Sequence, residues 1–252
     1  MSDMPSEIGN APGGAAGRTV LLAGATSPSG LAIARALLSR RARVIGVGRD
    51  PQKLAALTAA LGAMPAASGA SAGPGRKDAP GTLRTETCSL TNETEVAALA
   101  TRLAADGERV DGVIPLVGGW RGGGGLAGQT EGDYRALEES FTAVRIVSRA
   151  FDTDLRASSA GRFAIVSSSA VARPLAGGAN YAAVKAASEA WTRAIAQGFA
   201  KAARDTGEPL RAAAIVFRVR SLDVVVDELA QRIAGLWDAE ADALNDAVVD
   251  VG

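Results

Sequence analysis

Two side chains four residues apart, Tyr181 and Lys185, could transfer a proton at a shared site. Residues at this spacing lie on one face of a helix, and a helix is expected over this stretch. A free tyrosine titrates near about pH 10, so it is a poor acid or base at neutrality. A nearby lysine ammonium favours the phenolate and lowers the pKa of the tyrosine. We therefore expect Lys185 to make Tyr181 a usable general acid or base.

Ser168 could supply a hydrogen bond to the same reacting group. It stands 13 residues before Tyr181, at the end of an apolar stretch that is expected to be a strand. A carbonyl that accepts hydride develops negative charge on its oxygen, which needs a proton donor and a hydrogen bond. Tyr181 would give the proton and Ser168 would bind the oxygen. The alternative is a tyrosine–lysine pair on a solvated helix face and a serine that merely ends a strand.

The stretch VLLAGATSPSGLAIA has the order of a buried strand, a glycine-rich turn and a helix start. Gly24 and Gly30 stand six residues apart, like the first and third glycines of a dinucleotide-binding loop, where helix N–H groups bind a pyrophosphate. Pro28 takes the place of the middle glycine; it has no N–H but is tolerated in the first turn of a helix. The flanking Ser27 and Ser29 could donate to the phosphate or simply cap the helix.

The residues after the second expected strand bear on the choice of cofactor. An acidic side chain there binds the ribose 2′-hydroxyl of NAD, whereas an arginine accommodates the 2′-phosphate of NADP. The sequence has Gly48 and then Arg49, and the following Asp50-Pro51 is a helix N-cap with proline in the first turn. This pattern favours NADP(H) over NAD, unless Arg49 is only a solvated surface charge.

The composition excludes several classes of function. The chain has no histidine, which removes histidine-based triads and most catalytic zinc sites, and we expect no metal. Lys+Arg and Asp+Glu are both 27, so no overall field attracts nucleic acid or an anionic membrane. No apolar run reaches the roughly 18–20 residues that span a bilayer, and the N-terminus does not resemble a secretory signal. With Cys88 as the single cysteine, these features predict a cytoplasmic protein in a reducing compartment.

Short apolar segments alternate with amphipathic ones and predict an α/β fold. Such alternation is typical of a doubly wound, Rossmann-type parallel sheet, here of seven strands, with helices on both faces and a ligand crevice at the carboxyl ends of the strands. We expect a flexible arm over 1–17, one domain over 18–252 and a flexible insertion over 62–81. The expected strands are 19–23, 43–47, 83–88, 113–117, 163–167, 212–217 and 247–251, and the expected helices are 30–40, 51–61, 93–105, 131–155, 181–203 and 222–237.

These motifs resemble those of the short-chain dehydrogenase/reductase (SDR) family. AGATSPSGLAIARALL aligns without gaps to the family's T-G-x-x-x-G-x-G cofactor loop, with Ala23 replacing the threonine. The serine, tyrosine and lysine described above have the family's order and spacing. The resemblance implies that Lys185 also contacts the nicotinamide ribose and that Ser140 takes the place of a proton-relaying asparagine. The cofactor residues that it implies are Gly24, Thr26, Ser27, Ser29, Gly30, Arg49, Ser89, Leu90, Val117, Gly118 and Lys185.

The chain departs from the family pattern in several places. The N-N-A-G after the fourth strand becomes Pro115–Gly118, and Ser89 replaces an acidic residue near the adenine. The Pro-Gly pair after the sixth strand becomes Phe217-Arg218, and the segment that usually covers the substrate is nearly absent, which predicts an open crevice. Arg218 and Arg220 alternate at this strand end and could bind an anionic substrate group, or they could be solvated loop charges.

Three hypotheses remain for the function. The first is an NADP(H)-dependent oxidoreductase for a small carbonyl or alcohol substrate, active as a homodimer or homotetramer, as the resemblance implies. The second is a reductase of a flat heterocycle such as a pterin or quinone, because the loop around Trp120 resembles that of dihydropteridine-reductase-like family members. The third is a non-catalytic nucleotide-binding or scaffold protein on the same fold, which the altered cofactor loop favours.

Overall fold

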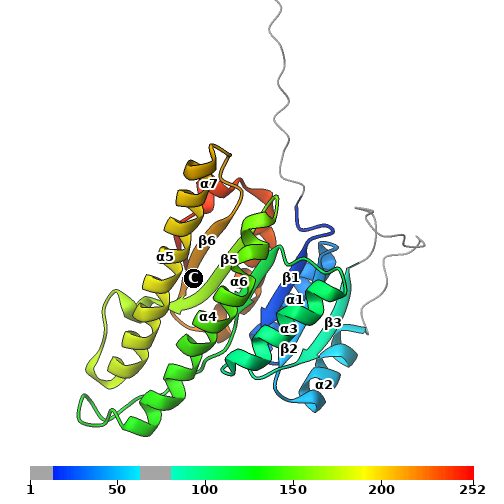
Figure 1. The fold of residues 1–252 in the computed structure, drawn as a ribbon. Coiled ribbons are helices and arrows are strands. Elements are labelled where there is room, and N and C mark those ends of the chain that lie inside the picture. The colour runs from blue at the N-terminus through cyan, green and yellow to red at the C-terminus, as the bar shows by residue number, and fades with distance from the viewer. Residues whose placement is uncertain (1–13, 63–80) are drawn as a thin grey trace, which may run out of the picture.

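The structure, a computed structural model, describes residues 14–62 and 81–252. Most of the arm expected at 1–17 and of the insertion expected at 62–81 therefore lies outside the described residues. The rest forms a seven-stranded parallel sheet with the strand order β3-β2-β1-β4-β5-β6-β7 (Figure 1). The strands are β1 (Thr19–Ala23), β2 (Arg43–Gly48), β3 (Thr82–Thr87), β4 (Gly112–Pro115), β5 (Arg162–Ser168), β6 (Ala213–Val219) and β7 (Val248–Val251).

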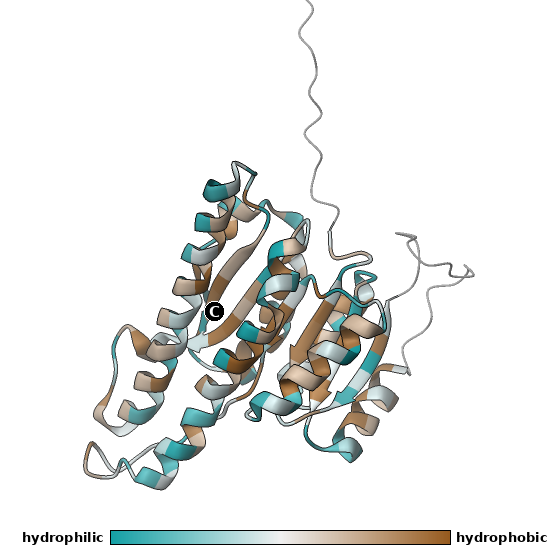
Figure 2. Ribbon diagram, in the orientation of Figure 1, coloured by the Kyte–Doolittle hydropathy of each residue, from teal (hydrophilic) through white to brown (hydrophobic). Residues whose placement is uncertain are grey.

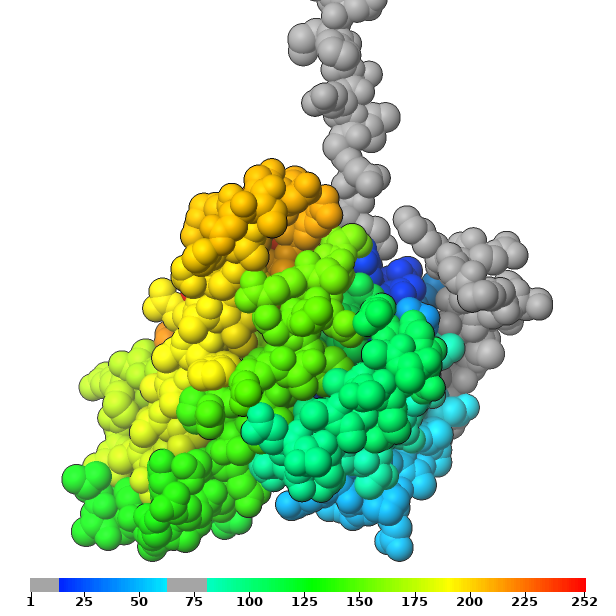
Figure 3. All heavy atoms as spheres, viewed as in Figure 1, coloured from blue at the N-terminus to red at the C-terminus, as the bar shows by residue number. Residues whose placement is uncertain are grey.

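Helices cover both faces of the sheet, as the alternation of segments predicted. Helices α1, α2 and α6 contribute to one apolar cluster and α3, α4 and α5 to the other. Figure 3 shows α3, α4 and α5 side by side over the second face. The helices are α1 (Pro28–Ser39), α2 (Pro51–Gly62), α3 (Glu93–Ala105), α4 (Glu131–Ala157), α5 (Ala179–Thr206), α6 (Leu222–Ala234) and α7 (Ala241–Leu244), with 3-10 turns η1 (Ser169–Val171), η2 (Ala176–Gly178) and η3 (Gly235–Asp238).

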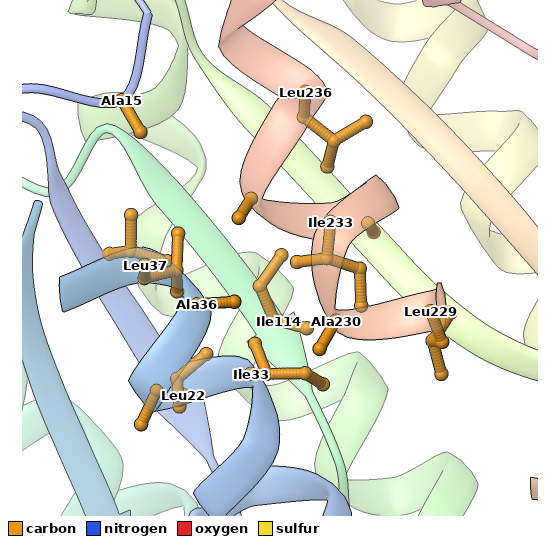
Figure 4. Close-up of a cluster of buried hydrophobic side chains, with 14 of the residues drawn as sticks. Ala15, Leu22, Ile33, Ala36, Leu37, Ile114, Leu229, Ala230, Ile233 and Leu236 are labelled. Atoms are coloured by element: carbon orange, nitrogen blue, oxygen red, sulfur yellow. The ribbon is translucent and has the colours of Figure 1, made fainter. Parts of the chain in front are cut away.

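The central strands are apolar because both of their faces are buried. In β1, Leu22 packs in the cluster beneath α1 and α6, and its neighbour Leu21 packs in the cluster beneath α3–α5. Figure 2 shows the hydrophobic residues gathered along these strands. In Figure 4, Leu22, Ile33 of α1 and Ile233 of α6 meet in one layer. This packing holds the start of α1 against the sheet and beside α6.

Several helix boundaries differ from the expected ones, among them the start of α1, the end of α4, both ends of α5 and the end of α6. The first helix begins at Pro28 rather than Gly30, because the Ser27 hydroxyl caps it by accepting from the Gly30 N–H and proline fits the first helical position. The last expected helix ends at Ala234 rather than Trp237, since Gly235 forms its C-cap and the chain continues as η3 and then α7. None of the helices within 14–62 and 81–252 combines the length and the apolar character that crossing a membrane requires.

Arg162, at the start of β5, is a buried guanidinium that joins the sheet to the C-terminal segment. It is 1% exposed and donates to the carbonyl oxygens of Leu236 at 2.9 Å and Ala239 at 2.8 Å, as well as to those of Gly161 and Arg211. Burial lowers its pKa to about 10, so the group stays charged at neutral pH. Its role here is to satisfy backbone oxygens that are buried or partly buried.

Replacing this arginine is expected to destabilise the protein. Arg162→Met keeps the bulk of the stem but leaves buried carbonyls without donors, which should cost about 3 kcal/mol. Urea unfolding of both proteins measures the loss. Arg232→Met, which removes an exposed pair with Glu228, should cost less than about 1 kcal/mol. Equal stability of the Arg162 variant and the parent would show that the buried hydrogen bonds contribute nothing net.

Candidate active site

An open cleft of about 1300 Å³ lies at the carboxyl ends of the strands. It includes the start of α1 and the residues after β4, so it lies at the point where the strand order reverses between β1 and β4. Open α/β sheets bind ligands at such a point. The cleft exceeds the roughly 300–1,000 Å³ of a usual small-molecule pocket, so it has room for more than one small molecule. The predicted site residues that line it are Ser27, Ser29, Val117, Gly118, Ser168, Tyr181 and Lys185.

The predicted serine, tyrosine and lysine come together in this cleft. Tyr181 lies in the first turn of α5 and Lys185 in the next, and the Lys185 Nζ lies 5.8 Å from the centroid of the Tyr181 ring. This amine donates to the Val166 carbonyl of β5 at 2.8 Å. Ser168 ends β5, and its hydroxyl caps η1 by accepting from the Ala170 N–H. That turn leads the chain back toward the start of α5.

The pKa of Tyr181 differs in direction from the expectation. Burial raises the pKa of Tyr181, and a hydrogen bond with Ser168 opposes burial only in part. The lysine was expected to lower this pKa, but its amine donates to the Val166 carbonyl and lies over the tyrosine ring, 5.8 Å from the ring centroid. Tyr181 is therefore a protonated phenol at neutral pH, which suits a proton donor.

The lysine is itself perturbed by its surroundings. Burial lowers the pKa of Lys185 to about 8, and the charge of Glu189 opposes this change. The amine is thus mostly protonated at pH 7 and loses its charge as the pH rises through about 8. A lysine held in this range is sensitive to every charge near it.

The geometry of the first turn explains its two glycines. Gly24 has a φ of +100°, and a Cβ there would lie 3.1 Å from the backbone of Leu116 and Val117. A Cβ at Gly30 would lie 2.3 Å from the Ala25 carbonyl oxygen, which is a backbone atom that cannot move aside. The turn therefore needs glycine at both positions, and it brings the start of α1 against the residues that follow β4.

The serines around Pro28 have a structural role and also face the cleft. Ser27 caps α1, and its hydroxyl lies 3.0 Å from that of Ser29. Capping, one of the two alternatives left open by the sequence, therefore applies to Ser27. Contact of either hydroxyl with a phosphate stays a prediction.

The end of β2 is tightly packed where the cofactor-selecting side chain would lie. A Cβ at Gly48 would lie 3.0 Å from Cγ2 of Thr26, so glycine fits this position and larger residues do not fit without a shift. Arg49 follows it, is exposed, and has no ion pair with any residue in the described part of the chain. A free arginine at this strand end matches the NADP pattern.

Some predicted residues lie outside the cleft lining. The Ser140 hydroxyl is buried and donates to the Leu137 carbonyl at 2.6 Å, so it is not directed at a substrate. Ser140 lies beneath Gly118, where a Cβ would be 3.6 Å from its own. The backbone N–H of Ser89 is bound by the Glu95 carboxylate. The predicted residues that do not line the cleft are Gly24, Thr26, Gly30, Arg49, Ser89, Leu90 and Ser140.

Arg218 is not available to an anionic substrate. It points to α5, where its Nε and Nη2 donate to the two oxygens of Glu189 at 2.9 and 2.6 Å. Only Arg220 of the two candidates lines the cleft. Glu189 was not among the expected site residues, although it stands four residues after Lys185 and therefore lies on the same face of the helix as Tyr181 and Lys185.

A glycine-rich loop and the segment before α5 form one wall of the cleft, and they project together beyond the sheet (Figure 1). Gln129 joins them: its amide donates to the carbonyls of Gly123 and Gly177 at 3.1 and 3.0 Å. The side chains of Trp120 and Leu175 line the cleft while 66% and 74% exposed, so its mouth is apolar. Trp120 was among the residues expected near the substrate, whereas the role of Gln129 was not expected from the sequence.

Comparisons with known proteins agree on one family. Residues 18–203 match the family described as short chain dehydrogenase. Dehydrogenase/reductase SDR family member 11 of Gallus gallus is 33% identical over 133 residues, which are 53% of this chain and 47% of that protein, so the match spans about half of the relative's length.

Solved structures show the same fold. A metagenomic short-chain oxidoreductase in complex with NADP has a TM-score of 0.74 and 26% identity, covering 93% of this chain and 96% of that one. A short-chain type dehydrogenase/reductase from Mycobacterium ulcerans has a TM-score of 0.76 and 20% identity, covering 92% and 87%. The expected seven-stranded Rossmann-type fold is thus confirmed.

Proposed function

Because this chain belongs to the short-chain dehydrogenase/reductase family, we propose that it transfers hydride between NADP(H) and a small carbonyl or alcohol substrate. The observation that carries the proposal is the convergence of Ser168, Tyr181 and Lys185 in one cleft at the reversal point of the sheet. A protein that only binds a nucleotide has no need of this proton-transfer set. The relative solved with NADP supports the choice of cofactor.

The residues present fit a dinucleotide. Gly24 lets the backbone of the first turn lie close to the residues after β4, and the start of α1 opens into the cleft, where helix N–H groups favour a pyrophosphate. Pro28 has no N–H, so one donor of the usual loop is missing, and Ser29 at the next position would compensate with its own backbone and hydroxyl. Lys185 would hold the nicotinamide ribose, and Arg49 the 2′-phosphate.

Each group of the proposed catalytic set has a distinct task. Bound NADPH would supply the hydride. The protonated phenol of Tyr181 donates a proton to the substrate oxygen as negative charge develops there. Ser168 donates a hydrogen bond to the same oxygen, and the Lys185 ammonium stabilises negative charge at the phenol as its proton leaves. In the oxidation direction Tyr181 would have to act as a base in its phenolate form, and its raised pKa makes that form scarce at neutral pH.

The first experiment is a titration of the protein with NADPH and NADH, followed by nicotinamide fluorescence, and then a panel of carbonyl substrates. We expect NADPH to bind more tightly than NADH and at least one carbonyl to be reduced. Tight NADPH binding without turnover on a broad panel would favour the scaffold hypothesis instead. Absence of binding to either nucleotide would reject the oxidoreductase.

A reductase of flat heterocycles is the second candidate, because the exposed indole of Trp120 lines the cleft. An aromatic side chain at the mouth can stack on a planar ring. Quinones and pterins tested beside aliphatic ketones separate the two candidates. A preference for planar rings that is lost in Trp120→Ala would select the second.

Arg49 is expected to set the preference for NADPH. Arg49→Ala removes a charged donor worth about 1.5–3 kcal/mol to a phosphate, so the Kd for NADPH should rise roughly tenfold or more while that for NADH stays unchanged. Fluorescence titration measures both constants. Arg35→Ala, which removes an exposed arginine of α1, serves as the matched control. A similar loss of affinity for both nucleotides would contradict the proposed contact.

A further inference from the structure

A buried carboxylate lies one helical turn beyond the lysine of the proposed catalytic set. Glu189 is 6% exposed, and two strands supply donors to it. The hydroxyl of Ser167 in β5 donates to its Oε1 at 2.6 Å, and Arg218 of β6 donates to both of its oxygens. Within residues 14–62 and 81–252, the hydrogen bonds to this carboxylate come from the sheet on which α5 packs.

The strand register explains how these donors meet. Ser167 and Arg218 are directly paired between β5 and β6, so their side chains are neighbours on the face that carries α5. The residues on either side of Ser167 are also engaged: the Val166 carbonyl accepts from Lys185, and Ser168 faces the cleft. The last three residues of β5 thus contact the three side chains Tyr181, Lys185 and Glu189 on one face of α5. A glycine at position 218, as the family resemblance implied, could not make this contact.

The carboxylate is ionised at neutral pH. Burial raises the pKa of Glu189, but the hydrogen bonds from Arg218 and Ser167 outweigh burial, and the pKa lies below its usual range. Its negative charge opposes the effect of burial on Lys185. A buried ion pair is weak evidence for stability, because apolar residues of similar volume often stabilise as well. Stability alone therefore does not account for a pair at this place.

We propose that Glu189, held by Arg218 and Ser167, is a positioning residue that fixes α5 on the sheet and keeps the Lys185 amine in place and charged. The inference rests on the proposed function, in which Lys185 is used as a cation. The groups that act on Lys185 are the Tyr181 ring and the charge of Glu189 from α5, the Val166 carbonyl from β5 and, bound to Glu189, Arg218 from β6. Two further charges act on the ion pair of Glu189 and Arg218: Arg193 lowers the pKa of Glu189, and Asp250 raises that of Arg218.

The test is the pH dependence of Lys185 labelling in the free protein. Trace acetylation with acetic anhydride, followed by peptide mass spectrometry, gives the pH at which Lys185 is half-reactive, with Lys53 and Lys201 as internal references. In Glu189→Gln, an isosteric change, this midpoint should fall by about 1 pH unit, because the negative charge that opposes the effect of burial on Lys185 is lost. Arg218→Met should act in the same direction, because an unpaired buried Glu189 takes up a proton.

Matched variants separate positioning from simple stability. Glu228→Gln, which removes an exposed carboxylate paired with Arg232, should leave the midpoint unchanged, and Glu189→Asp, which keeps the charge, should stay close to the parent. A lower melting temperature with an unchanged Lys185 midpoint in both Glu189→Gln and Arg218→Met would overturn the proposal. If a carbonyl is reduced, the alkaline limb of kcat should move with the midpoint.

The labelling result does not depend on turnover. A protein without reductase activity but with a shifted Lys185 midpoint would reject the proposed function and keep the electrostatic coupling. An active protein in which Glu189→Gln leaves both the Lys185 midpoint and the pH profile of kcat unchanged would keep the proposed function and reject the electrostatic coupling. The two failures are therefore distinguishable.

Discussion

Tyr181→Phe is expected to lower kcat for carbonyl reduction by about 10²–10⁴-fold, because it removes the hydroxyl that donates the proton and keeps the ring. NADPH affinity should change little, since the resemblance assigns the ribose contact to Lys185. The measurement is steady-state kinetics with the best substrate of the panel, together with the fluorescence titration. The ring that packs in the cleft is retained, so the fold should be unaffected.

The chain offers an internal control for this prediction. Its other tyrosine, Tyr134, lies near the start of α4 and does not line the cleft. Tyr134→Phe should therefore keep full activity. Unchanged turnover in Tyr181→Phe would reject the proposed proton donor and, with it, the mechanism.

Lys185→Met is expected to combine two losses. The charged amine that stabilises the developing phenolate disappears, which should lower kcat by about 10²-fold or more. The proposed ribose contact disappears as well, so the Kd for NADPH should rise roughly tenfold. Kinetics and nucleotide titration separate these effects, because Tyr181→Phe should show the first and not the second.

Lys201→Met is the matched control for the lysine. Lys201 lies on the same helix, is exposed and pairs with Asp205. Its loss should alter neither kcat nor nucleotide affinity. If Lys185→Met bound NADPH as tightly as the parent, the ribose contact would be wrong, and only the electrostatic role would remain.

The fold could be predicted from the sequence because its signals are local. Strands that are buried at every position and nearly all apolar, such as β1, need cover on both faces, and the alternation with amphipathic helices leaves few other arrangements. Gly24 and Gly30 were also readable, because the turn requires a left-handed φ at one and close backbone contact at the other. The start of α1 was less predictable, because a helix could begin either after the Ser27 cap or at Gly30. The end of α6 was less predictable too, because the chain continues directly into the 3-10 turn η3.

The proposed catalytic set was predictable for a similar reason. Tyr181 and Lys185 share one helix face by their spacing alone, and Ser168 ends an apolar segment. Order and spacing were thus enough to nominate the residues. They could not show what surrounds each side chain. The expected direction of the Tyr181 pKa was wrong for that reason: burial raises this pKa, and the hydrogen bond with Ser168 opposes burial only in part.

Residue types and their spacing along the chain therefore led to the seven-stranded fold, the family and the three proposed catalytic side chains. The tertiary structure alone decided that Arg218 binds Glu189 instead of a substrate and that the Ser140 hydroxyl bonds to its own helix. The pairing of Ser167 with Arg218 depends on the register between β5 and β6, which brings together residues 51 positions apart (218 − 167). No local pattern encodes such a contact, because it exists only when both strands and α5 have assembled.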